Sequence, residues 1–540
     1  MKSLTLLLIL LLPLSALAFA FDDEHHHFDP NEKLGTVSFP ISCSSAVQKP
    51  FKRGVALLHS FAYEEAGQQF QEIERQDSQC AMAYWGEAMS LYHQLWSRPT
   101  KSDLKRGQEL LDKAKAAKAR TQRERDFINA LDVFYRDSDK SDHEQRASAY
   151  AAAMKQVHKS YTKDDEAAVF YALALLSSGK GDTEIENAKQ AIAILNKLFA
   201  KDPDHPGVAH YLIHACDNPN FAQQGLAAAR IYASIAPSSA HALHMPSHIF
   251  TRLGLWQDDI QSNLAALDAA RKQSSTSHPM MHHQLHSMDF LEYAYLQIGD
   301  DARAKALVEE VASIKRENVE PEFRYYLNAM LTGFPARYAL ERRQWKDALA
   351  LQPPADIEPY SQAVTYWAQA IAAGHLHHAA AARNAVDRYD AMLEATRKTD
   401  KSYYADGMKT DRDEAHAWLA FAEGKNEEAL KLLREVADKE DSLGKAEVAL
   451  PAREMVADML LDLGRHQDAL MEYDKSLHTD PNRFNGLYGA ARAAELTKQP
   501  QKAAVYYAQL LKNCDNGSHS DRPELARAKA QLATKTVGGN

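Results

Sequence analysis

From Leu450 to Arg483 the chain reads LPAREMVADMLLDLGRHQDALMEYDKSLHTDPNR. Small residues stand at Ala457 and Ala469, with Gly464 between them and Pro481 near the end. Apolar residues recur at helical spacing on both sides of the glycine, which indicates two amphipathic helices joined by a tight turn. Because such a hairpin cannot bury its apolar face alone, it needs neighbours that stack on it.

The same pattern repeats with a period of 34 residues, the length of the stretch from Leu450 to Arg483. Further units begin at Val47, Ala81, Pro206, Ala240 and Phe484. Five units have a glycine where the hairpin must turn: Gly254, Gly299, Gly374, Gly424 and Gly464. The period and its small and large apolar positions resemble the tetratricopeptide repeat (TPR) family. This resemblance implies an all-α fold, an α-solenoid of stacked TPR helix-turn-helix hairpins wound as a right-handed superhelix.

Chain length and proline positions indicate how the repeats are divided. A chain of 540 residues is too long for one compact core, so a linear array fits it better. Helices should break at Pro335, at Pro353-Pro354 and at Pro359. We expect a signal peptide at 1–20, an extended segment at 21–46, an N-terminal TPR array with a histidine-rich groove at 47–318, an irregular proline-containing helical connection at 319–359, a C-terminal TPR array at 360–520, and a terminal helix and tail at 521–540.

The first residues indicate the compartment. Lys2 precedes an apolar run from Leu4 to Leu14, and small-residue cleavage sequences follow at 16–18 and 18–20, as in a cleavable signal peptide. No later stretch reaches about 20 uninterrupted apolar residues, so we expect no integral membrane segment after cleavage. The net charge of -10 argues against a nucleic-acid partner. The sequence therefore predicts a periplasmic or secreted protein.

Four cysteines are present, and export would permit a disulfide between two of them. Cys43 precedes the first repeat helix and Cys80 follows its antiparallel partner, so both fall at the same end of one hairpin. We predict a Cys43 to Cys80 disulfide. Cys216 and Cys514 are interpreted as buried thiols.

Histidines gather at one set of repeat positions. In the TPR family the first helix of each hairpin lines the concave groove, and the resemblance assigns these groove positions here. The central three units place six histidines, two aspartates and one arginine there: His210, His214, Asp217, His241, His244, His248, Arg252, His286 and Asp289. The first two units add His59, His93 and Trp85. Since the chain has only 24 histidines, this concentration predicts a functional strip.

A divalent metal, zinc or copper, is one hypothesis for the strip. Two histidine pairs have the i, i+4 spacing that lets two imidazoles reach one ion. The candidate ligands are His210, His214, His241, His244, His248 and His286. Two alternatives stay open: the imidazoles contact the carboxylates of a bound peptide, or they serve as structural hydrogen-bonding groups between repeats.

The segment from His241 to Gly254 departs from a generic repeat because Pro246 lies inside the expected first helix. This segment, together with 38–43 and 80–86, resembles a group of exported bacterial TPR proteins of unassigned activity. The resemblance supports fold and location and names no substrate.

Two functions follow from these observations. The first is an exported scaffold that binds a partner protein or peptide in its concave groove. The alternative is a metal- or small-ligand-binding protein that uses the histidine and aspartate cluster. Residues 210–214 read HYLIH and lack the glutamate that a zincin protease needs, and no nucleotide or hydrolase motif occurs. No residue is assigned a catalytic role, and an enzyme is the minor interpretation.

Overall fold

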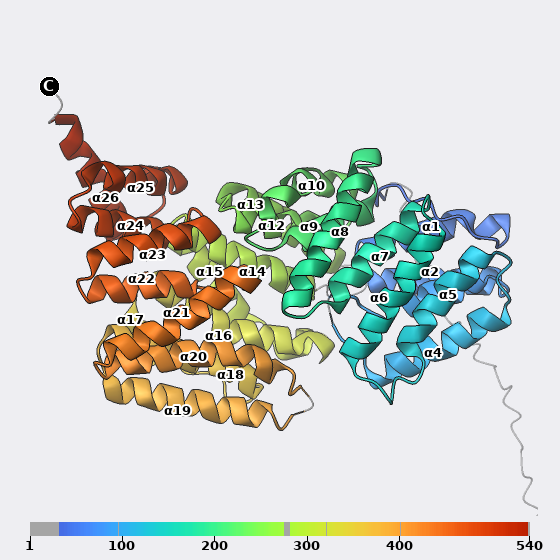
Figure 1. Ribbon diagram of the computed structural model, residues 1–540, viewed down its shortest axis with the longest axis horizontal. Helices are drawn as coiled ribbons and strands as arrows, with labels where there is room; N and C mark the ends of the chain where they lie inside the picture. The colour runs from blue at the N-terminus through green and yellow to red at the C-terminus, as the bar shows by residue number, and fades with distance from the viewer. Residues whose placement is uncertain (1–31, 96, 275–280, 320, 400, 538–540) are drawn as a thin grey trace, which may run out of the picture. The chain divides into compact units, whose positions relative to one another are not determined.

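Antiparallel helical hairpins follow one another along the chain (Figure 1). The computed structural model describes residues 32–540 except 96, 275–280, 320, 400 and 538–540. All regular secondary structure in these residues is helical, and residues 33–540 form one unit. The all-α solenoid of TPR-type hairpins is therefore confirmed. The predicted signal peptide lies outside the described residues.

The first part of the array contains α1 (Gln48–His59), α2 (Tyr63–Gln76), α3 (Ala81–Ser90), α4 (Lys101–Ala116), α5 (Gln122–Tyr135), α6 (His143–Ser160), α7 (Asp165–Ser178) and α8 (Asp182–Lys201). The central part contains α9 (Pro206–Cys216), α10 (Ala222–Ile235), α11 (Ala240–His244), α12 (Pro246–Arg252), α13 (Trp256–Ser274), α14 (Met281–Gln297) and α15 (Asp301–Ser313).

The remaining helices are α16 (Arg324–Glu341), α17 (Trp345–Ala350), α18 (Pro359–His375), α19 (Ala379–Thr396), α20 (Tyr404–Ala422), α21 (Asn426–Leu443), α22 (Ala452–Asp462), α23 (His466–Thr479), α24 (Phe484–Leu496), α25 (Pro500–Asn513) and α26 (Pro523–Val537). Short 3-10 turns lie at Ser45–Val47, Arg316–Asn318, Pro321–Phe323 and Asp515–Gly517.

Small residues let neighbouring helices approach closely, as the repeat pattern requires. The Phe70 ring lies between Gly54 and Gly86, and a Cβ at either glycine would meet the ring at 2.7 Å or 2.4 Å. Four of the five predicted turn glycines, all except Gly374, have a positive φ. Gly374 instead lies inside α18 against Trp418, and His377 with φ 50° makes that turn. The interpretation of Gly374 as a turn residue is therefore wrong.

Prolines interrupt helices at fewer places than the sequence suggests. Pro335 lies within α16, which continues through it and packs against α14, α15 and α18. Pro359 is the first residue of α18, where its missing N–H costs no helical hydrogen bond. Pro353-Pro354 lies in the connection before that helix, as expected. The predicted break at Pro335 is wrong because tertiary packing on three sides outweighs the local cost of the proline.

The predicted disulfide is confirmed. Cys43 and Cys80 are bonded, with their Cα atoms 5.0 Å apart, and they tie the segment before α1 to the start of α3. Cys216 and Cys514 are free and buried, as predicted. Among the described residues, no helix has the length and apolar character needed to cross a membrane.

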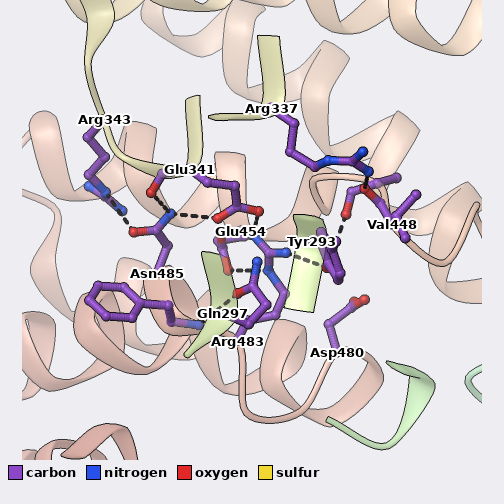
Figure 2. A network of polar contacts seen from close by, with 12 residues as sticks. Tyr293, Gln297, Arg337, Glu341, Arg343, Val448, Glu454, Asp480, Arg483 and Asn485 are labelled. Atoms are coloured by element: carbon purple, nitrogen blue, oxygen red, sulfur yellow. Dashed lines mark hydrogen bonds and ion pairs between the residues drawn. The ribbon is translucent and has the colours of Figure 1, made fainter. Parts of the chain in front are cut away.

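The C-terminal hairpins contact the central ones directly. The Trp256 side chain donates a hydrogen bond to the backbone carbonyl of Asn482, 226 residues away. Figure 2 shows a buried ionic network nearby, in which Arg483, 1% exposed, donates to Glu341 and Glu454 over 2.7–3.0 Å. Breaking such a buried network leaves unpaired charges, so it fixes α14, α16, α22 and α24 against one another.

The connection between α21 and α22, residues 444–451, is held by the same region and is called the 444–451 loop below. Arg337 of α16 donates to the carbonyl of Val448 over 3.1 Å (Figure 2). Asn218, which follows α9, donates to the carbonyl of Leu443, immediately before the loop. The loop is thereby attached to both the central and the C-terminal hairpins.

Candidate metal centre

The six predicted histidine ligands form two groups of three. Triad A consists of His210 and His214 from α9 and His241 from α11. Triad B consists of His244 from α11, His248 from α12 and His286 from α14. In each triad, one nitrogen from each ring lies within 4.8 Å of the other two. The short helix α11 therefore supplies one histidine to each triad.

Triad A is arranged around His210. Its Nδ1 lies 2.6 Å from the backbone carbonyl oxygen of His59, and because a carbonyl can only accept, this nitrogen donates. In the neutral ring Nε2 then carries a lone pair. That single lone pair faces Nε2 of His214 at 3.1 Å and Nε2 of His241 at 3.0 Å. A proton on one neighbour satisfies one contact, whereas a cation between the three nitrogens satisfies both.

Triad B has the same kind of support. Nδ1 of His244 lies 2.6 Å from Oδ1 of Asn263, whose amide nitrogen donates to Asp259. The amide orientation therefore makes His244 the donor and leaves a lone pair on its Nε2. Nε2 of His248 lies 3.0 Å from that nitrogen. Nδ1 of His286 contacts the Tyr326 hydroxyl at 2.5 Å, and one of the two His286 ring nitrogens lies within 4.8 Å of a nitrogen of His244 and of His248.

These separations fit shared ions. Nitrogen ligands about 2.0–2.1 Å from a tetrahedral zinc ion lie about 3.3 Å from each other. The separations of 3.0 and 3.1 Å between ring nitrogens are close to that value. Hydrogen bonds from the opposite ring nitrogen to a carbonyl or carboxylate are typical of histidines that bind metal.

His248 differs from the other five histidines because two carboxylates contact its Nδ1. Asp217 lies 2.8 Å and Glu447 3.1 Å from this atom. Burial lowers the pKa of His248, but Asp217 and Glu447 more than offset this effect and raise it to about 10. Without metal, a proton on Nε2 of His248 can therefore be donated to His244. A metal ion bound in triad B would displace that proton.

Burial keeps the other ligands neutral. It lowers the pKa of His210 and of His286 to about 3, and it lowers the pKa of His214, His241 and His244 well below 6.5. Neutral imidazole is the form that binds metal, so these five rings are ready to coordinate at neutral pH.

Pro246 positions the ligands of triad B. It is the first residue of α12 and separates that helix from α11. The expectation that Pro246 lies within one continuous helix is therefore wrong. His244 ends one helix and His248 lies in the first turn of the next. The helix break thus occurs between two ligands of one triad.

The histidine strip is not an open groove surface, contrary to the sequence interpretation. His210 is fully buried, and His241, His244 and His248 are also buried. Phe61 packs on triad A, Phe290 packs on triad B, and the 444–451 loop brings Glu447 onto His248. The repeat register could not predict this cover because it comes from residues outside the strip.

Two further predicted residues lie behind triad B. Arg252 donates through Nε to Asp217 over 2.8 Å and through a terminal nitrogen to the carbonyl of Lys445 over 2.8 Å. Arg252 therefore holds both Asp217 and the 444–451 loop in place. Asp217, His248 and Glu447 also bring three possible ligand atoms within 4.8 Å of one another, but Asp217 contacts Nδ1 of His248, whereas Nε2 of His248 faces His244 in triad B.

Four predicted groove residues lie elsewhere. The His59 ring contacts Glu166 and Tyr211, and only its carbonyl reaches triad A. Trp85 is 1% exposed and packs in an aromatic core with Phe39, Phe127 and Phe170. The His93 ring stacks on Tyr63 and contacts Ser97. Asp289 pairs with Arg337. None of the four side chains joins the triads: His59 and Trp85 are buried among other helices, and His93 and Asp289 are partly exposed and contact other residues.

Several site residues were not predicted from the sequence. Asn263, Phe61, Phe290, Tyr326 and Glu447 contact the triads from other elements. His283 also lies 5.9 Å from His241 between ring centroids. The sequence contains only weak signals for two of these residues: Asn263 is a polar residue in the middle of α13, and His283 lies one turn before His286. Nothing in the local sequence singles out Glu447, which is 199 residues from His248.

Comparisons with known proteins add the following. No family model and no curated protein matches the sequence. Among solved structures, the chain is similar to the human IFIT1 dimer with m7Gppp-AAAA, at 11% identity and TM-score 0.36, covering 80% of this chain and 90% of that one. It is also similar to the P58(IPK) TPR domain, at 13% identity and TM-score 0.21, covering 69% and 99%. TM-scores this low carry no argument, so the assignment of the fold rests on the helical hairpins seen in the structure.

Proposed function

We propose that this helical-repeat protein binds two divalent transition-metal ions, one in each histidine triad. The observation that carries the proposal is the arrangement around His210, whose single Nε2 lone pair faces two other imidazole nitrogens at 3.0 and 3.1 Å. A cation satisfies all three nitrogens at once. In triad B, Nε2 of His248 lies 3.0 Å from Nε2 of His244, and His286 completes a second group of three.

The ligand set selects the class of metal. All six candidate donors are imidazole nitrogens, which suit zinc and copper and not magnesium or calcium. Copper(II) generally binds such sites more tightly than zinc, so the metal bound in the cell also depends on supply. We also propose an exported location, which agrees with the Cys43 to Cys80 disulfide.

Binding of a peptide by the histidine strip has less support. The rings that would contact a peptide are largely buried, and Phe61, Phe290 and the 444–451 loop cover them. A partner bound elsewhere on the helical scaffold is compatible with the metal centre. We therefore place metal binding ahead of peptide binding for these histidines.

The test is the metal stoichiometry of untagged protein, stripped with a chelator, loaded with zinc and measured by elemental analysis after gel filtration. We expect two ions per chain in the natural protein. The His210→Ala/His214→Ala and His244→Ala/His248→Ala variants should each retain one ion. His416→Ala is the matched control, because His416 pairs with Asp390 far from either triad in sequence, and it should retain two.

Circular dichroism must show that each variant keeps its helical content. Loss of both ions from either folded double variant would mean that the triads are not separate sites. Less than half an ion per chain in the folded natural protein would overturn the proposal. Two ions that persist in both double variants would place the metal elsewhere.

A further inference from the structure

One aromatic ring touches all three histidines of triad A. The Phe61 ring centroid lies 4.4 Å from that of His210 and 5.5 Å from those of His214 and His241. Phe61 is 4% exposed and has φ 55°, a left-handed conformation that costs a bulky residue free energy. Such strain persists where the surroundings hold it, and it occurs often at functional sites.

The Phe290 ring likewise touches all three histidines of triad B. Its ring centroid lies 4.9 Å from that of His244, 4.8 Å from that of His248 and 5.4 Å from that of His286. Phe290 belongs to α14 and is buried, one turn after the ligand His286. Each triad therefore has its own phenylalanine, Phe61 from the turn between α1 and α2 and Phe290 from α14.

The two triads are adjacent. Ring centroids of His214 and His248 are 6.2 Å apart, and those of His241 and His244 are 6.4 Å apart. Each of these pairs joins one histidine of triad A to one of triad B, so ions bound in the two triads would be neighbours, as in two-metal sites. Three nitrogens leave at least one position open on each ion. Among the residues that the structure describes, no carboxylate or thiol joins either triad as a fourth ligand.

Charge also requires another ligand. Two divalent ions would place four positive charges among six neutral imidazoles in a buried site. The neighbouring carboxylates are Asp217 and Glu447, and Arg252 offsets one of them. A buried charge without a counter-charge is costly, so an anion that enters with the metals stabilises the centre.

We propose that the two ions share one small exogenous monoanion of one to three heavy atoms, such as hydroxide or azide, and that Phe61 and Phe290 limit its size. The inference rests on the proposed metal binding. Phenyl rings offer no ligand atoms and exclude water, so beside the ions they oppose a larger oxyanion such as acetate. The two phenylalanines are the size-determining residues of the site.

The first test uses full-length protein that holds two copper(II) ions per chain. On titration with azide, we expect a charge-transfer absorption band that saturates at one azide per two copper ions. The copper electron paramagnetic resonance signal should disappear at the same point, because a bridging ligand couples the two spins. Acetate should leave the band unchanged at the same concentrations.

The second test uses Phe61→Ala and Phe290→Ala, with Phe421→Ala as the control. Phe421 is also a buried phenylalanine, but it packs beside Trp418 in α20. Both site variants should keep two copper ions and should bind acetate at least ten times more tightly, measured by displacement of azide. The control should behave like the natural protein.

The outcomes separate the two proposals. If the folded protein does not bind two copper ions, the proposed metal binding fails first. If two ions bind but azide gives no band, or two azides bind per pair without loss of the resonance signal, the shared-ligand inference is wrong. If both phenylalanine variants keep two ions and still reject acetate, the size limit is wrong.

Discussion

His248 is the candidate ligand whose surroundings differ most from those of the other five. Its Nδ1 faces Asp217 at 2.8 Å and Glu447 at 3.1 Å, while the other ring nitrogen points to His244. A carboxylate on the far side of a ligating imidazole fixes the ring and makes it a stronger base. Triad B should therefore depend on Asp217 although Asp217 does not touch the metal.

The Asp217→Asn variant should lower the affinity of triad B by about 10- to 100-fold, because it removes this negative charge. Competition with a chromogenic zinc chelator would measure the two binding constants. Asp390→Asn is the control, since Asp390 makes a similar contact with His416 at 3.1 Å outside the triads. Equal affinities in the Asp217→Asn variant and the control would contradict the assigned role.

A second histidine cluster surrounds a buried carboxylate. Glu166 contacts His59 at 2.9 Å and His205 at 3.2 Å, and Tyr211 contacts the other nitrogen of His59. Burial raises the pKa of Glu166, but the two histidines more than offset this and lower it to about 2. Burial alone would lower the pKa of His205. The contact with Glu166 more than offsets the burial, so the pKa of His205 is raised above 6.5.

The Glu166→Gln variant should lower the free energy of unfolding by about 3–5 kcal/mol, because it leaves a buried charged His205 without its partner. The stabilisation from ionised Glu166 is fully present above pH 4.5 and is lost as the pH falls toward about 2. The stabilisation from protonated His205 is fully present below pH 6.5 and is lost as the pH rises through the raised pKa of His205.

Urea unfolding at pH 5.5 and pH 9 would measure this effect. The difference between the natural protein and the Glu166→Gln variant should be largest at pH 5.5 and smaller at pH 9. A difference that does not change with pH would mean that packing, and not the ion pair, stabilises this cluster.

At the residue scale, the repeat register predicted that the six histidines lie near one another, but it could not predict how they are grouped. It assigned one strip, and the structure divides the strip into two triads because the α11 helix presents His241 and His244 to different neighbours. It also assigned Trp85 to the groove. The segment before α1 carries Phe39 onto Trp85, and a repeat pattern contains no information about such a segment.

At the scale of elements, the hairpins could be predicted and their exceptions could not. Pro246 and Pro335 read alike in sequence, yet one starts a helix and the other lies inside one. The difference lies in tertiary contacts, since α16 packs against α14, α15 and α18. Gly374 was misassigned for a similar reason: its missing side chain makes room for Trp418 and does not make a turn.

The hairpin of α1 and α2 should depend on its disulfide. The Cys43→Ser/Cys80→Ser variant removes a crosslink with a sequence separation of 37, which the loop-entropy relation equates to about 4 kcal/mol. Hydrogen exchange should become faster in α1 and α2 while the zinc stoichiometry stays at two. Cys514→Ser, which alters a buried free thiol, is the control. Unchanged exchange in α1 and α2 would show that packing alone holds the hairpin.

On the scale of the whole molecule, the centre joins distant parts of the chain. The 444–451 loop contributes Glu447 to His248 and the Lys445 carbonyl to Arg252. Arg337 anchors the loop through Val448 (Figure 2). A metal ion in triad B should therefore stabilise the contact between the C-terminal and central hairpins. No local sequence signal pointed to this contact.

Zinc binding should slow hydrogen exchange in the 444–451 loop as well as in α9, α11, α12 and α14. A ligand at 100 times its dissociation constant stabilises the state it binds by about 2.7 kcal/mol, and part of this should reach the loop. In the Glu447→Gln variant, protection of the histidine helices should remain and protection of the loop should fall. Protection confined to the histidine helices in the natural protein would contradict the coupling.

X-ray absorption at the zinc edge, recorded on full-length protein with two zinc ions per chain, tests the two histidine triads most directly. The expected first shell is dominated by imidazole nitrogens at about 2.0–2.1 Å, three per ion, with the scattering of whole imidazole rings beyond them. A first shell of sulfur at about 2.3 Å, or of oxygen without imidazole scattering, would contradict the account.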